Sequence, residues 1–168
     1  MDKITLTRRA ALSALAALVV APRAASANPV ATRFREIRVD VSPLADKDEA
    51  DFGSWIAAVL PGYLKQTFAK YLAPGDRSAS TLVARVDEVI LGPSNSAFGN
   101  PAIDAIDGIQ GEGIVLSPRG QEIASYPLYA AVGANTFLNM PYQLEITRRR
   151  VETLAQSFAQ WLPGKMGL

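Results

Sequence analysis

Carboxylate side chains are the first candidates for chemistry, because the sequence contains no cysteine and no histidine. Asp87 and Glu88 are adjacent in a stretch with strand character, so their side chains point to opposite faces and form a poor catalytic pair. Asp104 and Asp107 lack the D-x-D-x-D-G spacing of a calcium loop. We interpret all four as solvated turn and strand positions, and we predict no catalytic residue and no metal site.

The missing cysteine and histidine exclude several classes of site. A thiol nucleophile, a disulfide, a Ser-His-Asp triad and an imidazole base are ruled out, and zinc, copper, haem and iron–sulfur centres lose their usual ligands. We therefore expect a domain that folds without a cofactor. Any catalysis would depend on carboxylates, lysine, tyrosine or serine, and a small carboxylate-dependent hydrolase remains the alternative to a non-catalytic protein.

The glycines of residues 108–113 suggest a nucleotide-binding loop at first sight. The dinucleotide fingerprint, G-x-G-x-x-G, lies between a strand and a helix, whereas here a strand continues through the glycines. Glycines inside a strand mark curvature or a bulge. We interpret these glycines as structural.

Three consecutive arginines, Arg148 to Arg150, occur in a segment with helical periodicity. Glu145 precedes Arg149 by four residues and Glu152 follows Arg148 by four, the spacing at which side chains pair on a helix surface. Local ion pairing therefore explains much of the triplet. Binding to an anionic lipid or to an acidic partner remains the alternative.

Two segments rich in turn-forming residues, 92–101 and 133–141, contain apolar side chains that are unusual in solvent-exposed loops: Phe98, Phe137, Leu138 and Met140. Loops carry binding residues more often than the scaffold does, and both segments can lie at the same end of a sheet. We therefore consider these four residues candidates for a binding surface. The alternative is that they fold back onto the core.

Four strands are expected from alternating apolar residues, at 33–41, 81–91, 103–116 and 122–132. The first strand presents Ile37, Val39 and Val41 on one face, and a tight turn at 117–120 joins the last two as a hairpin. The inward residues of the second strand are expected to be Leu82, Ala84, Val86 and Ile90.

Two amphipathic helices are expected from apolar residues spaced by three and four. The first covers about 52–72, with a kink or a break at Pro61-Gly62, and the second covers 142–162 and is stopped by Pro163-Gly164. Aromatic residues on these apolar stripes are assigned to the core, with a ligand cage as the alternative: Trp55, Tyr63, Phe68, Tyr71 and Trp161. The apolar side of the second helix consists of Leu144, Val151, Leu154, Ala155, Phe158 and Leu162.

This order of elements, β-α-β-β-β-α, predicts the fold class. Two amphipathic helices need an apolar sheet face to cover, which gives a two-layer α+β sandwich. We expect a mainly antiparallel four-stranded sheet with both helices on one face. Residues 28–168 are long enough for one domain with a single core.

The first 27 residues have the three parts of an export signal. A basic lead with Arg8 and Arg9 precedes an apolar run at 10–21, which is shorter than the about 20 residues of a transmembrane helix. Ala25 and Ala27 then form an A-x-A site, so we expect cleavage after Ala27 and release of a periplasmic protein with no transmembrane span. The lead resembles twin-arginine signals, although alanine stands where that family favours phenylalanine. The alternative is a general secretory signal.

Removing the signal changes the charge of the protein. Residues 1–27 hold four of the 17 basic side chains and one of the 16 acidic ones, which leaves 13 and 15 and a net charge of −2. Phosphate binding needs a clustered positive surface, so nucleic acid is not expected as a partner.

The element order, with residues 114–120 as a strand followed by a turn, resembles the auxiliary envelope lipoproteins of ABC-type lipid transporters. The chain departs from that family because it lacks the lipid-bearing cysteine. The resemblance implies a periplasmic accessory module that serves lipid or solute transport, binds an envelope protein or a lipid, and catalyses nothing.

Overall fold

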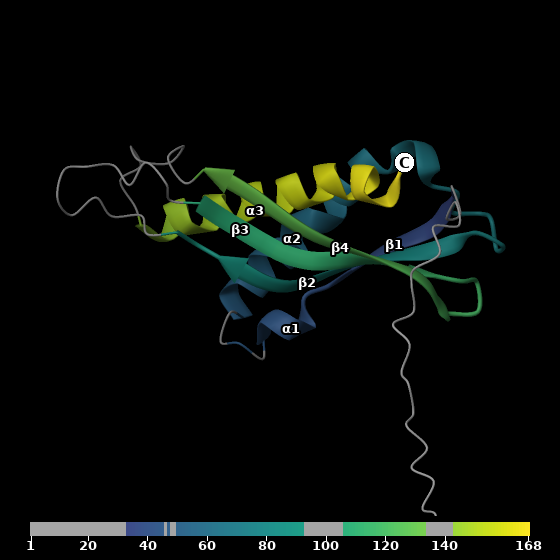
Figure 1. Cartoon of the computed structure of the whole chain (residues 1–168), viewed down its shortest axis with the longest axis horizontal. Helices are drawn as coiled ribbons and strands as arrows, with labels where there is room; N and C mark the ends of the chain where they lie inside the picture. The colour runs from purple at the N-terminus through teal and green to yellow at the C-terminus, as the bar shows by residue number, and fades with distance from the viewer. Residues whose placement is uncertain (1–32, 46, 48–49, 93–105, 134–142) are drawn as a thin grey trace, which may run out of the picture.

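A four-stranded sheet forms one layer of the protein (Figure 1). The computed structural model describes residues 33–45, 47, 50–92, 106–133 and 143–168. The strands are β1 (Phe34–Asp40), β2 (Ser80–Ile90), β3 (Ile106–Leu116) and β4 (Glu122–Gly133), and they lie in sequence order across the sheet. The β1–β2 pair is parallel, whereas β2–β3 and β3–β4 are antiparallel.

Two long helices form the second layer, α2 (Ala50–Thr67) and α3 (Gln143–Met166). A parallel strand pair needs a crossover connection, and the segment with α1 (Ser42–Ala45), α2 and the 3-10 helix η1 (Ala69–Tyr71) provides it between β1 and β2. Helix α2 packs on β1, α3 packs on β3 and β4, and the two helices contact each other. The predicted α+β class, with a mainly antiparallel sheet, is confirmed.

The inward face of β2 follows the predicted alternation only as far as Val86. Leu82, Ala84 and Val86 are completely buried. A bulge between Val86 and Glu88 then adds one residue to the strand, and such an insertion reverses the faces of all later side chains. Val89 is consequently buried and Ile90 is exposed, so the prediction that Ile90 faces inward was wrong.

The apolar side of α3 is confirmed from Val151 onward, because Leu154, Ala155, Phe158 and Leu162 are all fully buried. Leu144 lies on the same side of the helix as Val151, seven residues later, but it is 71% exposed. It belongs to the first turn of α3, which precedes the buried part of the helix. Trp161 is 47% exposed. Trp161 is not among the residues that form the core or pack against it, so its core assignment was wrong.

Pro61, where a kink or a break was expected, and Pro163, where the second helix was expected to stop, both lie inside helices. Helix α2 continues through Pro61. Proline removes the hydrogen bond to the carbonyl four residues earlier, which here belongs to the exposed Ala57. Helix α3 continues past Pro163 to Met166 and ends at Gly167, whose φ is +76°. The N–H groups of Leu168 and Gly167 donate to the carbonyls of Pro163 and Gly164, which is a Schellman cap.

The strand glycines are structural, although only Gly111 lies at a bulge as predicted, and Gly113 instead serves close packing. A Cβ at Gly113 would lie 2.7 Å from the Leu162 side chain, so glycine lets α3 approach β3 closely. Gly111 lies opposite the bulge in β2.

Candidate functional site

The ends of the two predicted binding loops meet at one end of the sheet. Ile90 pairs with Gly108, and Ile106 pairs with Gly133, so the residues that flank 93–105 lie beside the end of β4, the residue before 134–142. Several predicted residues lie outside the described part of the chain: Phe98, Asp104, Phe137, Leu138 and Met140, and the export residues Arg8, Arg9, Ala25 and Ala27.

A buried ion pair lies at this end of the sheet and joins β3 to α3. Arg150 Nε donates to Asp107 Oδ2 at 2.7 Å, and Arg150 Nη2 donates to Asp107 Oδ1. The same Nη2 donates to the Gly92 carbonyl at 2.6 Å, and the Gly92 N–H donates to Asp107 Oδ1 at 3.0 Å. We refer to Asp107, Arg150 and Gly92 as the clamp.

The clamp corrects two interpretations of the sequence. Asp107 has no exposed surface, so the prediction that it is solvated was wrong. Arg150 is 4% exposed and pairs with a residue 43 positions away, so local pairing does not explain it. The spacing of residues in the sequence could have indicated that both side chains are buried. Asp107 precedes the buried Ile109 by two residues, so both lie on one face of the strand. Arg150 precedes the buried Leu154 by four residues, so both lie on one face of the helix.

The clamp holds three separate segments together. Gly92 is the residue before segment 93–105, Asp107 is the second residue of β3, and Arg150 lies in the second turn of α3. The bidentate contact between guanidinium and carboxylate has a fixed geometry. The clamp therefore forms a rigid base at the end of the sheet where both loops attach.

Three further carboxylates, those of Asp87, Glu88 and Glu112, lie near cations or hydroxyls. Arg85 pairs with Asp87 at 3.0 Å and also with Glu112, which accepts a hydrogen bond from Ser125. Glu88 lies 4.0 Å from Lys47. Asp87 and Glu88 are partly exposed, in agreement with the prediction. In the described ranges, no three acidic, histidine or cysteine side chains are grouped as a metal site would require.

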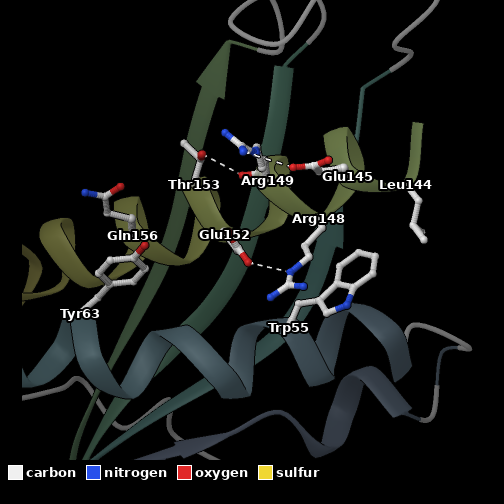
Figure 2. Close-up of a pocket in the computed structure, with 9 residues that line it drawn as sticks. All are labelled: Trp55, Tyr63, Leu144, Glu145, Arg148, Arg149, Glu152, Thr153 and Gln156. Atoms are coloured by element: carbon white, nitrogen blue, oxygen red, sulfur yellow. Dashed lines mark hydrogen bonds and ion pairs between the residues drawn. The ribbon is translucent and has the colours of Figure 1, made fainter. Parts of the chain in front are cut away.

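A groove of about 630 Å³ runs between α2 and α3 on the side of the helices that faces away from the sheet (Figure 2). We call it the helix groove. Helix α2 contributes two aromatic side chains, and α3 contributes one leucine and a row of polar side chains. The lining residues are Trp55, Tyr63, Leu144, Glu145, Arg148, Arg149, Glu152, Thr153 and Gln156.

The polar row consists of ion pairs within α3, as the spacing of the residues predicted. Arg148 Nε lies 2.9 Å from Glu152 Oε1, and Arg149 Nη2 lies 3.2 Å from Glu145 Oε1 (Figure 2). The two arginine and two glutamate charges cancel. The Thr153 hydroxyl donates to the Arg149 carbonyl at 2.8 Å.

The aromatic residues of α2 are partly buried and pack against the core. The ring of Trp55 lies 5.8 Å from that of Phe52, centroid to centroid, and this contact supports it from the side. Phe68 is fully buried and Tyr71 is partly buried. The core assignment is therefore confirmed for Phe68, whereas Trp55 and Tyr63 divide their surface between the core and the helix groove.

Within the residues that the structure describes, no helix has the length and apolarity needed to cross a membrane.

Comparison of the sequence with known protein families and with curated proteins gives no match. Among solved structures, the chain is similar to a minor lipoprotein from Acinetobacter baumannii, at 17% identity and a TM-score of 0.40, over 78% of this chain and 92% of that one. It is also similar to PelC, solved as a dodecamer, from Paraburkholderia phytofirmans, at 12% identity and a TM-score of 0.43, over 81% and 90%. No functional residue carries over at these values, so the proposals below depend on this chain's own side chains.

Proposed function

We propose that this protein is a non-catalytic binding or accessory module of the cell envelope. It acts in the periplasm as a single domain, residues 28–168, after cleavage behind Ala27. Its binding surface is formed by the apolar loop residues Phe98, Phe137, Leu138 and Met140. The observation that carries this proposal is that the ends of both loops meet around the buried clamp.

The geometry of the clamp favours binding over acid–base catalysis. Asp107 faces a guanidinium, whereas a hydrolase that uses carboxylates needs two of them converging, one with a raised pKa. Loops that recognise a partner work best when a rigid scaffold presents them, and the clamp provides such a scaffold. We therefore do not favour the alternative of a carboxylate-dependent hydrolase.

The partner that fits apolar loop residues is an envelope protein or a lipid, in the service of lipid or solute transport. Apolar side chains that project from polar loops mark surfaces for protein or membrane contact. The net charge of −2 after cleavage argues against nucleic acid.

The first experiment tests the loop surface. Tagged protein is expressed with its export signal and recovered from the periplasm, and partners are compared between the wild type and a variant with Phe98→Ser and Phe137→Ser. A matched control is Ile123→Ser, because Ile123 is 54% exposed and lies at the opposite end of β4. We expect the double variant to lose partners that the control retains. Recovery of the same partners from all three proteins would eliminate the loop surface.

The second experiment tests export. We expect N-terminal sequencing of the periplasmic protein to begin at Asn28. Arg8→Lys together with Arg9→Lys should block export through the twin-arginine route. Continued export would identify the general secretory route instead, and an intact Met1 would show that the signal is not removed.

A further inference from the structure

The helix groove combines aromatic and polar surface. Trp55 and Tyr63 present aromatic surface from α2, and α3 presents carboxylate, guanidinium, hydroxyl and amide groups opposite them (Figure 2). The volume of about 630 Å³ falls within the range of small-molecule sites. Trp55 and Tyr63 are eight residues apart on one helix, a separation of about 12 Å, so the groove is elongated.

The charges of the helix groove are already balanced, which argues against an ionic ligand. Arg148 pairs with Glu152, and Arg149 pairs with Glu145. An anion would have to compete with these carboxylates, and a cation would have to compete with the guanidinium groups. A two-fold axis through the middle of the row, between Arg148 and Arg149, would set Glu145 against Glu152 of a second copy, so a pairing centred there is disfavoured.

The polarity of the helix groove argues against a hydrocarbon ligand. An acyl chain would cover Glu152, Thr153 and Gln156 without offering them hydrogen bonds, and burying polar groups in that way is unfavourable. An amphipathic helix needs a continuous apolar surface for anchors at successive turns. Among the described residues that line the groove, the apolar ones are Trp55, Tyr63 and Leu144.

We propose that the helix groove, which α2 and α3 line, binds an uncharged, hydroxyl-rich chain, an oligosaccharide. The apolar C–H faces of sugar rings stack on Trp55 and Tyr63, whose rings are rigid and amphipathic. The sugar hydroxyls, each a donor and an acceptor, bond to the polar row. A guanidinium has five N–H donors, and the bond from Arg148 to Glu152 uses one of them.

The test uses tryptophan fluorescence of the exported protein. The chain contains two tryptophans, so Trp161→Phe leaves Trp55 as the only reporter. This variant is titrated with three neutral hexasaccharides, maltohexaose, cellohexaose and hexa-N-acetylchitohexaose, and affinities are checked by calorimetry. We expect saturable binding of at least one of them, with a change in Trp55 emission.

Substitutions then locate the site. Trp55→Ala, and separately Tyr63→Ala, should weaken binding by about tenfold or more, as removal of a stacking residue does. Trp161→Ala is the matched control, because Trp161 is exposed and does not line the helix groove, and it should bind as the wild type does. Circular dichroism verifies that each variant is folded, and Tyr63→Ala keeps the test decisive if Trp55→Ala unfolds.

Three results would overturn the proposal. The first is that none of the hexasaccharides binds. The second is that folded Tyr63→Ala and Trp55→Ala bind as well as Trp161→Ala. The third is that phosphatidylglycerol vesicles, or an amphipathic helical peptide, displace the sugar or change Trp55 emission where the sugars do not. None of these results bears on the loop surface, whose partners are tested by Phe98 and Phe137.

Discussion

Two regions of α3 use the same residue type in opposite ways. Arg148 and Arg149 lie in the helix groove with side chains 55% and 51% exposed, and each pairs with a glutamate four residues away. Arg150, the next residue, has a side chain that is 5% exposed and pairs with Asp107 of β3. One step along a helix rotates a side chain by about 100°, and this rotation moves the third arginine from solvent into the core.

The comparison shows how much the surroundings of an ion pair decide. An exposed pair four residues apart on a helix contributes only about 0.3–0.5 kcal/mol, because water screens both charges. Losing one partner of a buried pair leaves an uncompensated charge in the interior, which costs about 3–5 kcal/mol. The clamp and the helix groove should therefore respond very differently to equivalent substitutions.

The largest effect is expected for Arg150→Met. The substitution leaves Asp107 buried without its cation and removes a donor from the Gly92 carbonyl, so the free energy of unfolding should fall by about 3–5 kcal/mol. Urea denaturation measures this change. Arg149→Met is the matched control and should lower the same quantity by about 0.5 kcal/mol or less. Equal losses in the two variants would refute the distinction between the regions.

A smaller effect of opposite direction is expected when Asp107→Leu is added to Arg150→Met. Arg150→Met leaves the buried Asp107 carboxylate without a cation, and Asp107→Leu removes that carboxylate. The double variant should therefore be more stable than Arg150→Met alone by about 1–3 kcal/mol. It should remain less stable than the wild type, because the peptide group of Gly92 loses both its partners. A double variant less stable than Arg150→Met would show that the stranded carboxylate is not the cause of the loss.

The exposed pair gives a still smaller effect. In a double-mutant cycle with Arg148→Ala and Glu152→Ala, the coupling in the free energy of unfolding should be about 0.3–0.5 kcal/mol. Salt near 1 M should abolish it, because the Debye length is then about 3 Å. The coupling between Asp107 and Arg150 should persist in the same salt. A salt-resistant coupling in the helix groove would contradict its assignment as a screened surface pair.

The smallest effect concerns Asp40, which lies outside the clamp and the helix groove. It shows how much the stability of the protein depends on acid pH where no buried ion pair is involved. Hydrogen bonds from the Ser42 hydroxyl at 2.7 Å and the Ser42 N–H at 3.0 Å hold the pKa of Asp40 below its ordinary value. This stabilisation is complete above the unfolded pKa of about 3.9 and disappears as the pH falls through the lower pKa of the folded protein.

Asp40→Asn should therefore lower stability by about 0.5 kcal/mol or less at neutral pH, since the group is only partly buried and solvent screens its charge, and the difference from wild type should shrink below about pH 4. Denaturation curves between pH 2 and 7 measure it. A constant difference across that range would show that the charge of Asp40 has no part in its contact with Ser42.

Local periodicity was sufficient to predict much of the fold. The four strands, the two long helices and the pairs Arg148–Glu152 and Arg149–Glu145 depend on spacings of two, three and four residues, which follow from backbone geometry. The exceptions have local causes that periodicity does not include. Ile90 is exposed because of a bulge whose position depends on the partner strand, and α3 passes Pro163 because Gly167 provides its cap.

The sequence alone determined which chemistries the protein lacks and which elements it forms, because composition and periodicity are properties of the chain itself. Only the tertiary structure decided that Asp107 and Arg150 meet, and that Trp55 and Tyr63 face the polar row of α3. Contacts between residues distant in the chain depend on how the helices lie on the sheet. Asp107 and Arg150 are 43 residues apart, so no local sequence pattern predicts that they pair. The pairing is needed because both side chains are buried, and they become buried only when the helices pack on the sheet.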